Sequence, residues 1–460
     1  MAESLKTNIV IVGAGLTGLT MAFYLKKAGI DFKIIDKSAK TGGVIQTISE
    51  KGFVYETGPN TGVVSYPEMT ELFEDLAGKC VLEVADPSAK RRLIWKGNQW
   101  NALPSGIWSA ITTSLFTWGD KFRILGEPWR KKGTDPNEKL SELVKRRMGN
   151  SFLDYAVDPF ISGVYAGDPS KLVTKYAMPK LYNLEQEYGS FVKGAMKKAK
   201  LPKTDRDKKA TREVFSAKGG LSRLIEALTE SIGSEHFILS ADSTMVKPIL
   251  EGFQMQITTP EHFYTLETKF LVTTCGGYAL SGLLPFLNEE EAAPFNDLKY
   301  AAVTQVLLGF NKWKGMSLKA FGGLVPGKEN KNILGVLFTS SFFESRAPQG
   351  GALLSVFMGG TKRPDIAKMD NYEIETIINK ELPRMMSDRR FNPDMIRIHR
   401  YPKAIPQYTE TTGKRYEVIE QLQEKYHGLI LAGNIRDGIG MADRVKQGRS
   451  IAEELIGKIR

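Results

Sequence analysis

The spacing of apolar positions near the start of the chain predicts its first elements. Residues 8–12 form a short continuous apolar run, which is typical of a buried strand. Leu16, Leu19 and Phe23 then recur at helical spacing, and residues 32–35 return to a continuous apolar run. The pattern therefore predicts a strand, a helix and a second strand before residue 36.

Three glycines stand at the predicted junction between the first strand and the helix. Gly13, Gly15 and Gly18 form a G-x-G-x-x-G pattern, in which the first glycine allows a tight turn, the second lets a pyrophosphate approach, and the third lets helix and strand pack closely. Asp36 ends the second predicted strand, about 20 residues further on, where a carboxylate can accept hydrogen bonds from a ribose. Together these features predict a dinucleotide site with its phosphates at a helix N-terminus.

Further glycines predict more segments that lie close to a large flat ligand. The pairs Gly42–Gly43 and Gly58–Pro59 follow soon after the acid, and glycine lets backbone approach a ligand closely. Near the other end of the chain, residues 429–431 form a short apolar strand, which Gly433 and a predicted helix follow. A simple nicotinamide domain needs neither Gly42–Gly43 nor Gly58–Pro59 so near its acid.

With these elements the chain resembles the flavoprotein superfamily of amine oxidases, phytoene desaturases and protoporphyrinogen oxidases. The resemblance implies that the cofactor is FAD, extended along the first helix, with the C-terminal helix facing the flavin edge that becomes negative on reduction. Asp36 and Lys40 depart from the usual Glu and Arg, but Asp offers the same acceptors. The cofactor-binding residues that the resemblance implies are Gly13, Ala14, Gly15, Leu16, Thr17, Gly18, Asp36, Lys37, Gly42, Gly43, Val44, Gly58, Pro59, Asn60, Thr61, Val246, Gly433, Asn434, Ile439, Gly440 and Met441.

A central stretch makes the resemblance more specific. Residues 162–172, SGVYAGDPSKL, resemble protoporphyrinogen oxidases in particular. A porphyrinogen is a large and mostly apolar macrocycle, so it needs an apolar slot with few charged groups for its propionates. Further blocks resemble that family in the same order, at 300–310, 321–326, 333–360 and 401–410.

The resemblance also implies four substrate-binding residues. Gly163 matches a glycine at the back of the slot, and Leu324 and Phe343 match apolar residues on either side of a pyrrole. Arg92 matches an arginine that holds a propionate, with Arg91 as a neighbouring candidate, because a guanidinium pairs well with a carboxylate. The expected reaction is flavin-driven, so no catalytic side chain is assigned.

The predicted fold is α/β. It combines a Rossmann-like FAD-binding domain of the glutathione-reductase type, an α+β substrate domain and a helical, membrane-associating insert. The FAD-binding domain is expected to be discontinuous, because its predicted motifs lie far apart in the chain. The expected parts are 1–90, 211–285 and 406–460 for the FAD-binding domain, 91–105 and 286–405 for the substrate domain, and 106–210 for the insert.

Charge and a second apolar pattern bear on the insert. The net charge of +11 favours an anionic partner, and residues 193–212 hold nine basic and two acidic side chains. Residues 97–119 carry no charge, and an interfacial helix beside anionic lipid or a helix packed on the protein's own core would both fit them. The apolar face of that predicted helix holds Ile107, Trp108, Ile111, Leu115 and Trp118.

Cysteine and histidine usage limits the chemistry. Cys80 and Cys275 are far apart, and the four histidines show no zinc spacing, so no metal site is predicted. No signal peptide and no spanning helix are expected. We therefore expect a cytoplasmic protein that is peripheral on the inner face of the cell membrane. Its expected partners are a porphyrinogen and molecular oxygen, and it is expected to form a homodimer. Nucleic acid is not an expected partner.

The resemblance implies oxidation of protoporphyrinogen IX to protoporphyrin IX in heme biosynthesis, with six electrons leaving in three hydride transfers and oxygen reoxidising the flavin. Coproporphyrinogen III, which has four carboxylates in place of two, is the alternative substrate. Another flavin oxidase of the superfamily, and a non-catalytic porphyrin-binding protein of the membrane surface, are the remaining alternatives.

Overall fold

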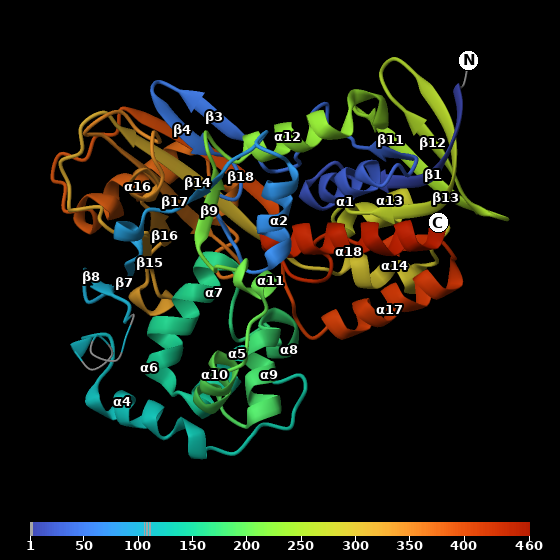
Figure 1. Cartoon of the computed structure of the whole chain (residues 1–460). Helices are drawn as coiled ribbons and strands as arrows, with labels where there is room; N and C mark the ends of the chain where they lie inside the picture. The colour runs from blue at the N-terminus through green and yellow to red at the C-terminus, as the bar shows by residue number, and fades with distance from the viewer. Residues whose placement is uncertain (1–2, 105, 107–108, 110–111) are drawn as a thin grey trace.

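The computed structural model describes residues 3–104, 106, 109 and 112–460. Two seven-stranded sheets organise the chain. Figure 1 shows the first sheet with its helices on the right, the second sheet at the upper left, and a group of helices from the middle of the chain below them. The α/β class is confirmed.

Strands from three separate parts of the chain build the first sheet. Strand β1 pairs in parallel with β2 on one side and with β13 on the other, and β19 pairs in parallel with β13. Parallel strands covered on both faces read as continuous apolar runs, which is why the sequence pattern showed them. The strands are β1 (Glu3–Val12), β2 (Phe32–Ile35), β10 (Phe237–Ile238), β11 (Ser243–Ile249), β12 (Gly252–Thr258), β13 (Phe263–Thr273) and β19 (Leu429–Leu431).

Helices cover both faces of this sheet. On one face α1 and α18 pack so closely that a Cβ at Gly448 would lie 2.5 Å from the carbonyl oxygen of Thr17. The other face packs around Val10 and Leu431. The helices are α1 (Leu16–Lys27), α2 (Pro67–Asp75), α12 (Ser222–Ile232) and α18 (Met441–Ile459) on the first face, and α13 (Leu280–Leu283), α14 (Glu289–Asn296) and α17 (Thr412–Lys425) on the second.

The second sheet has the order β18-β14-β17-β16-β15-β7-β8. Its central strand β14 alternates: Leu308 faces the core shared with helix α16, and Leu307 faces Phe53 of a separate hairpin. The elements are β7 (Arg92–Lys96), β8 (Gln99–Ala102), β14 (Tyr300–Phe310), β15 (Gly322–Leu324), β16 (Ile333–Leu337), β17 (Ala352–Gly359), β18 (Met395–Pro406), α15 (Thr339–Phe342) and α16 (Asn371–Met385).

Two small sheets connect these layers. The hairpin of β3 and β4 is antiparallel, and β9 pairs with both β5 and β6. Short 3-10 helices mark several turns. The strands are β3 (Thr47–Glu50), β4 (Phe53–Glu56), β5 (Gly62–Val63), β6 (Leu82–Val84) and β9 (Val214–Ala217), and the 3-10 helices are η1 (Pro87–Ala89), η2 (Glu127–Trp129), η4 (Ser234–His236), η5 (Gly277–Ala279), η6 (Gly327–Glu329) and η7 (Ile366–Lys368).

Short helices between residues 118 and 208 form the helical region, which lies at the bottom of Figure 1. They pack around Leu143, Val144 and Ile161. The helices are α4 (Trp118–Leu125), α5 (Leu140–Arg147), α6 (Asn150–Phe152), the π-helical segment η3 (Leu153–Val157), α7 (Asp158–Val164), α8 (Thr174–Ala177), α9 (Pro179–Tyr188), α10 (Phe191–Ala199) and α11 (Asp205–Lys208).

The uncharged stretch of residues 97–119 begins in the second sheet and not in a helix. Gly97 and Asn98 have φ of +60° and +64°, which forms a tight hairpin turn, so residues 99–102 return as β8. Leu115 is buried, whereas Trp118 begins α4 and is exposed. Ile107, Trp108 and Ile111 lie outside the described residues. No helix within the described residues is long and apolar enough to cross a membrane.

One packing relation bears on the expected domain boundaries. Helix α14 begins at Glu289, inside the stretch assigned to the substrate domain from residue 286. Its Phe295 is nevertheless buried with Leu422 of α17 in the core of the first sheet. We therefore propose a boundary just before β14.

Candidate functional site

The turn between β1 and α1 packs so tightly that two of its glycines admit no side chain. A Cβ at Gly18 would lie 2.0 Å from the carbonyl oxygen of Gly13, and a Cβ at Gly13 would lie 2.4 Å from Oγ1 of Thr274. Gly15 differs, because a Cβ there would meet no atom within 4 Å. Gly15 is also the N-cap of α1, so the helix begins at this open space with N–H groups that lack intrahelical partners. Leu16 and Thr17 are buried in its first turn.

Asp36 is held beside the same turn. Its Oδ2 accepts a hydrogen bond of 2.7 Å from the Ala14 N–H, and its Oδ1 accepts one of 2.8 Å from the Ser38 N–H. Each carboxylate oxygen can accept a second hydrogen bond, so the group keeps capacity for a diol. Lys37 follows it at the surface.

The Gly-Gly pair lies across the turn. Gly42 has φ of +100° and Gly43 has φ of +61°, a backbone that other residues rarely adopt. The Gly42 N–H donates to the Ala14 carbonyl at 2.8 Å, and a Cβ at Gly43 would lie 3.5 Å from Cα of Gly15. The predicted second glycine element is therefore brought to the first.

Residues 58–61 join this arrangement. A Cβ at Gly58 would lie 2.1 Å from the carbonyl oxygen of Val44, so the two backbones touch, with Pro59 and Thr61 beside them in the chain. Asn60 is buried, and its Nδ2 donates to the Gly58 carbonyl at 3.2 Å. Its Oδ1 has no partner among the described residues, which leaves an acceptor for a ligand.

Sequence reasoning missed the acid that anchors this segment. Glu56 ends β4 and is buried, and it accepts hydrogen bonds from Thr47 Oγ1 at 2.6 Å, the Leu221 N–H at 3.0 Å and Arg346 at 3.2 Å. Burial raises the pKa of Glu56, although these donors oppose the rise. Leu221 and Arg346 are distant in the chain, so no local signal could have shown this contact.

The closing segment meets the opening turn at Thr274. A Cβ at Gly433 would lie 2.6 Å from the Thr274 carbonyl oxygen, and the Gly433 N–H donates to Gln447 Oε1 at 2.9 Å. Asn434 has a buried Oδ1 without a partner in the described part of the chain. Thr274 was not predicted; its hydroxyl donates to the Gly13 carbonyl at 3.0 Å and links both segments.

Gly440 is the N-cap of α18, and its N–H donates to Asp443 Oδ2 at 2.9 Å. Met441 is the first helical residue. Ile439, just before them, packs against the core of the helical region. Helix α18, which is predicted to face the flavin, therefore begins where the cofactor segments and the helical region meet.

Val246 occupies a different place. It is buried in β11 and packs with Ile35 and Ile238. The Ala241 N–H donates to the Asp36 carbonyl at 3.0 Å, so this strand is tied to the acid. Val246 is therefore part of the core beside Asp36, the residue at which a ribose would bind.

These groups fit an extended dinucleotide. The open space at Gly15 admits a phosphate, since unpaired N–H groups of a helix attract anions there. The free amide oxygens of Asn60 and Asn434 suit a ligand that donates hydrogen bonds. Cys275 lies at the same edge, and burial raises its pKa to about 12, so the thiol stays neutral. No group of three possible metal ligands occurs within the described residues.

Two of the four predicted substrate residues meet directly. A Cβ at Gly163 on α7 would lie 2.4 Å from Cδ2 of Leu324 on β15. Leu324 is in register with Ile94 of β7, and Arg92 of that strand is paired with Gly322. Alternation therefore places Arg92 on the same face of the sheet as Leu324, at an exposed position, whereas the neighbouring Arg91 is one residue out of phase.

Phe343 lies in another cluster. It is buried with Ala89 and Phe342, and the guanidinium of Arg346 lies 5.2 Å from its ring. Leu324 packs instead with Leu115 and other residues. Phe343 and Leu324 therefore pack in separate clusters, and their place on either side of a pyrrole stays a prediction.

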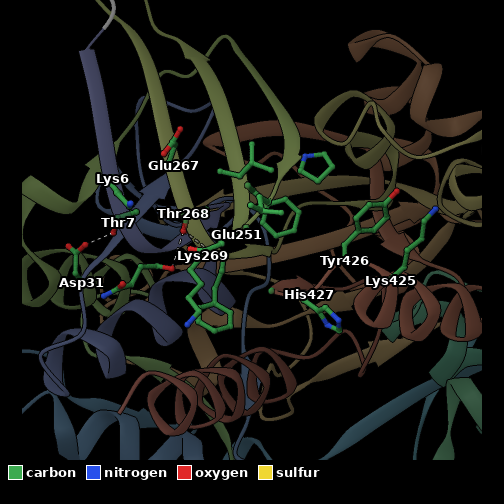
Figure 2. Close-up of a pocket in the computed structure, with 18 residues that line it drawn as sticks. Lys6, Thr7, Asp31, Glu251, Glu267, Thr268, Lys269, Lys425, Tyr426 and His427 are labelled. Carbon is green, nitrogen blue, oxygen red and sulfur yellow. Dashed lines mark hydrogen bonds between the residues drawn. The ribbon is translucent and has the colours of Figure 1, made fainter.

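A groove of about 1240 Å³ lies away from these turns, beside residues 6–8 in the middle of β1 and residues 425–428 just before β19. Figure 2 shows side chains of both charges around it. None of the glycine turns described above lines this groove. Among the described residues, every buried polar side-chain atom of the groove has a hydrogen-bond partner. Its charged residues are Lys6, Asp31, Glu251, Glu267, Lys269, Lys425 and His427.

Comparison with known proteins adds to this geometry. The chain matches the family described as flavin containing amine oxidoreductase over residues 16–456. Protoporphyrinogen oxidase 2, chloroplastic/mitochondrial, of Arabidopsis thaliana is 27% identical, and the match covers 98% of this chain and 94% of that protein. Coproporphyrinogen III oxidase of Bacillus subtilis (strain 168) is 24% identical, with 98% of each chain covered. A crystal structure from Exiguobacterium sp. 255-15, provisionally assigned as a protoporphyrinogen oxidase, has a TM-score of 0.81 at 22% identity, covers 100% of both chains and shows the same fold.

Proposed function

Because the chain belongs to the family of flavin-containing amine oxidoreductases, with FAD as its cofactor, we propose that it oxidises a porphyrinogen to the corresponding porphyrin. Curated relatives from plants and bacteria are named for oxidation of a porphyrinogen. The observation that carries the proposal is the contact of Gly163 with Leu324, which supports an apolar, glycine-lined slot like the one the sequence predicts.

The protein's part in this reaction is to bind and orient. The turn at Gly15 and the backbone of Gly42–Gly43 would hold the diphosphate, Asp36 would accept hydrogen bonds from the ribose, and Gly440 at the start of α18 would help to hold the flavin. When bound, FAD supplies the two-electron acceptor for each oxidation step. Gly163 and Leu324 would place the bridging carbons of the macrocycle and exclude water.

Protoporphyrinogen IX is the first proposed substrate, with oxygen as the electron acceptor. The plant relatives support it, since several named for this reaction match over 98% of the chain. Coproporphyrinogen III is the second candidate. It is supported by two bacterial relatives named for its oxidation, which match over 98% of the chain.

One experiment tests the proposed reaction. The purified protein should be yellow from bound FAD, and it should convert protoporphyrinogen IX or coproporphyrinogen III in air to a fluorescent porphyrin faster than the spontaneous reaction. The initial rates with the two substrates, each corrected for a protein-free control, decide between them. A flavin-loaded protein that accelerates neither reaction would refute the proposal.

We also propose that the helical region docks on an anionic membrane surface. Helix α4 has no buried residue, and its Trp118, Phe122 and Leu125 are 62%, 68% and 67% exposed, followed by Trp129 at 81%. An apolar face of this kind is typical of helices that lie in the membrane interface. Helix α10 packs beside η2, and its lysines add attraction to anionic lipid.

Sedimentation with vesicles tests this docking. The wild-type protein should sediment with phosphatidylglycerol vesicles and less with phosphatidylcholine vesicles. Trp129→Gln with Phe122→Gln should reduce the bound fraction about tenfold, because aromatic burial in the interface is lost. Tyr372→Gln is the matched control, since Tyr372 is 79% exposed on α16, far from α4 in Figure 1. Equal loss in both variants would contradict the proposal.

A further inference from the structure

Two lysines from distant parts of the chain meet at one aromatic ring. The ammonium of Lys180, on α9, lies 4.7 Å from the ring centre of Tyr66, and the ammonium of Lys446, on α18, lies 4.4 Å from it. These are distances of cation–π contacts. Burial lowers the pKa of Lys180, and the positive charges of Arg212 and Lys446 lower it further. The Arg212 N–H donates to the carbonyl of Val64, two residues before Tyr66, at 2.9 Å, so a third cation lies close by. All three residues are exposed.

No acid neutralises the three cations directly. Among the described residues, no carboxylate oxygen lies within 4 Å of the charged nitrogens of Lys180, Arg212 or Lys446. Asp443 is the nearby carboxylate that offsets part of their charge. It already accepts a hydrogen bond of 2.9 Å from the Gly440 N–H, so part of its capacity is used.

Neighbouring cations behave differently. Arg206 and Lys209 belong to the same basic run as Arg212, and they form ion pairs with the acids of α2. Arg449 of α18 also forms an ion pair with an acid of α2, Glu71. The chain therefore neutralises the cations around this cluster and leaves the cluster itself with an excess of positive charge.

The cluster lies between the cofactor segments and the proposed slot. Asp443 is in the first turn of α18, three residues after Gly440. Tyr165 follows Gly163 by two residues; burial raises its pKa to about 12, and the charges of Asp443 and Tyr66 contribute. Tyr165 and Ile439, which comes just before α18, pack against the same core of the helical region, so the helix that carries Gly163 and the end of α18 at which flavin is proposed to bind lie near each other.

We propose that Lys180, Arg212 and Lys446 form a subsite for carboxylate groups of the substrate macrocycle. This inference rests on the proposed function and adds a specificity site to it. Arg92 on β7 would hold a carboxylate at another side of the ring, so the two cationic places suit a substrate with carboxylates on more than one edge. The ring of Tyr66 supplies an apolar surface beside the charges.

Equilibrium binding of the product tests the subsite without turnover. The FAD-loaded protein is titrated with coproporphyrin III and with its tetramethyl ester, in the same detergent, and quenching of tryptophan fluorescence reports binding. Lys180→Ala with Lys446→Ala should raise the Kd of the free acid about tenfold and leave the Kd of the ester unchanged, because only the acid carries charge. The Kd of the acid should also rise with salt in the wild type more than in the double variant.

Lys175→Ala is the matched control. Lys175 also lies over a tyrosine ring, 5.4 Å from the centre of Tyr176, but it belongs to α8 and not to the cluster. Its loss should leave the binding of both porphyrins unchanged. A control variant that raises the Kd of the free acid as much as the double variant does would overturn the proposal, because general surface charge would then explain the effect.

The other possible results also decide whether the subsite exists. An equal rise in the Kd of the acid and of the ester overturns the subsite, because the double variant would then have lost packing and not charge. Competition by inorganic phosphate at low millimolar concentration, or loss of vesicle binding in place of porphyrin binding, overturns it in favour of a free-anion or lipid site. If the wild type oxidises a porphyrinogen and the double variant binds the acid normally, the subsite fails alone. If the wild type binds no porphyrin and oxidises no porphyrinogen, the proposed function fails with it.

Discussion

The cofactor region and the helical region are held together by opposite kinds of contact. At the opening turn, backbone touches backbone, and a Cβ at Gly18 would lie 2.0 Å from the Gly13 carbonyl. In the helical region the fully buried Arg147 lies between Glu127 and Glu185, with both ion pairs at 2.5 Å. The first region is therefore sensitive to an added atom at Gly13 and Gly18, and the second is sensitive to a lost charge.

The largest expected effect is at the turn. Gly18→Ala places a methyl group against the Gly13 carbonyl, which cannot move away because it is part of the turn. We expect the purified variant to lose at least about tenfold of its bound flavin, measured as absorbance near 450 nm per protein. Gly282→Ala is the control, since a Cβ there meets no atom within 4 Å. A Gly18→Ala protein with normal flavin content would contradict the comparison.

The second effect is on stability. Glu127→Gln leaves the buried Arg147 with one ion pair fewer, and we expect the free energy of unfolding to fall by about 3 kcal/mol. Denaturant titration of the FAD-loaded protein measures it, and bound flavin should remain under native conditions. Glu454→Gln removes an exposed pair with Lys458 and should cost under about 0.5 kcal/mol.

The two regions should also respond to pH in opposite directions. Burial alone would raise the pKa of Glu127, but donors including Ser190 and Arg147 outweigh it and hold the pKa below 4.5. Its contribution to stability is therefore present above pH 4.5 and is lost as the pH falls through the lowered value. Glu56 has a raised pKa, so its contribution is largest below 4.5 and decreases as the pH rises through the raised value.

Unfolding free energies between pH 3 and 7 test these signs. Glu127→Gln should remove part of the loss in acid, and Glu56→Gln should remove part of the decline at higher pH, by at most about 1.4 kcal/mol per pH unit for each group. The same pH dependence in the wild type and both variants would contradict the assignment.

A smaller effect is expected at the slot. Gly163→Ala places a methyl group 2.4 Å from the flexible end of Leu324, which can move at some cost. Flavin content should stay normal, and kcat/KM for the porphyrinogen should fall about tenfold. Adding Leu324→Ala should recover part of the loss. Loss of flavin in the single variant would show that Gly163 belongs to the cofactor region instead.

The smallest effect is expected at the groove of Figure 2. Lys269→Ala with His427→Ala should leave flavin content and turnover within about twofold of wild type, since neither residue belongs to the turns that follow β1 and β19. A loss of activity comparable to that of Gly163→Ala would show that this end of the sheet takes part in the reaction.

The sequence by itself determined the opening strand–helix–strand unit, the α/β class and FAD as the cofactor. Glycine spacing and apolar runs are local patterns, and in the parallel sheet each local choice agrees with the fold around it. Asp36 could be predicted for the same reason, because it lies at a set distance after the glycines. Whether the predicted cofactor and substrate residues bind their ligands stays a prediction.

Tertiary structure decided the contacts between distant residues. Glu56 meets Arg346, and Thr274 joins both ends of the chain. Gly163 lies against Leu324 although the two residues are far apart in the chain. Hydrogen bonds and packing between segments hundreds of positions apart leave no periodic trace in either segment, so only the folded chain shows which of them meet.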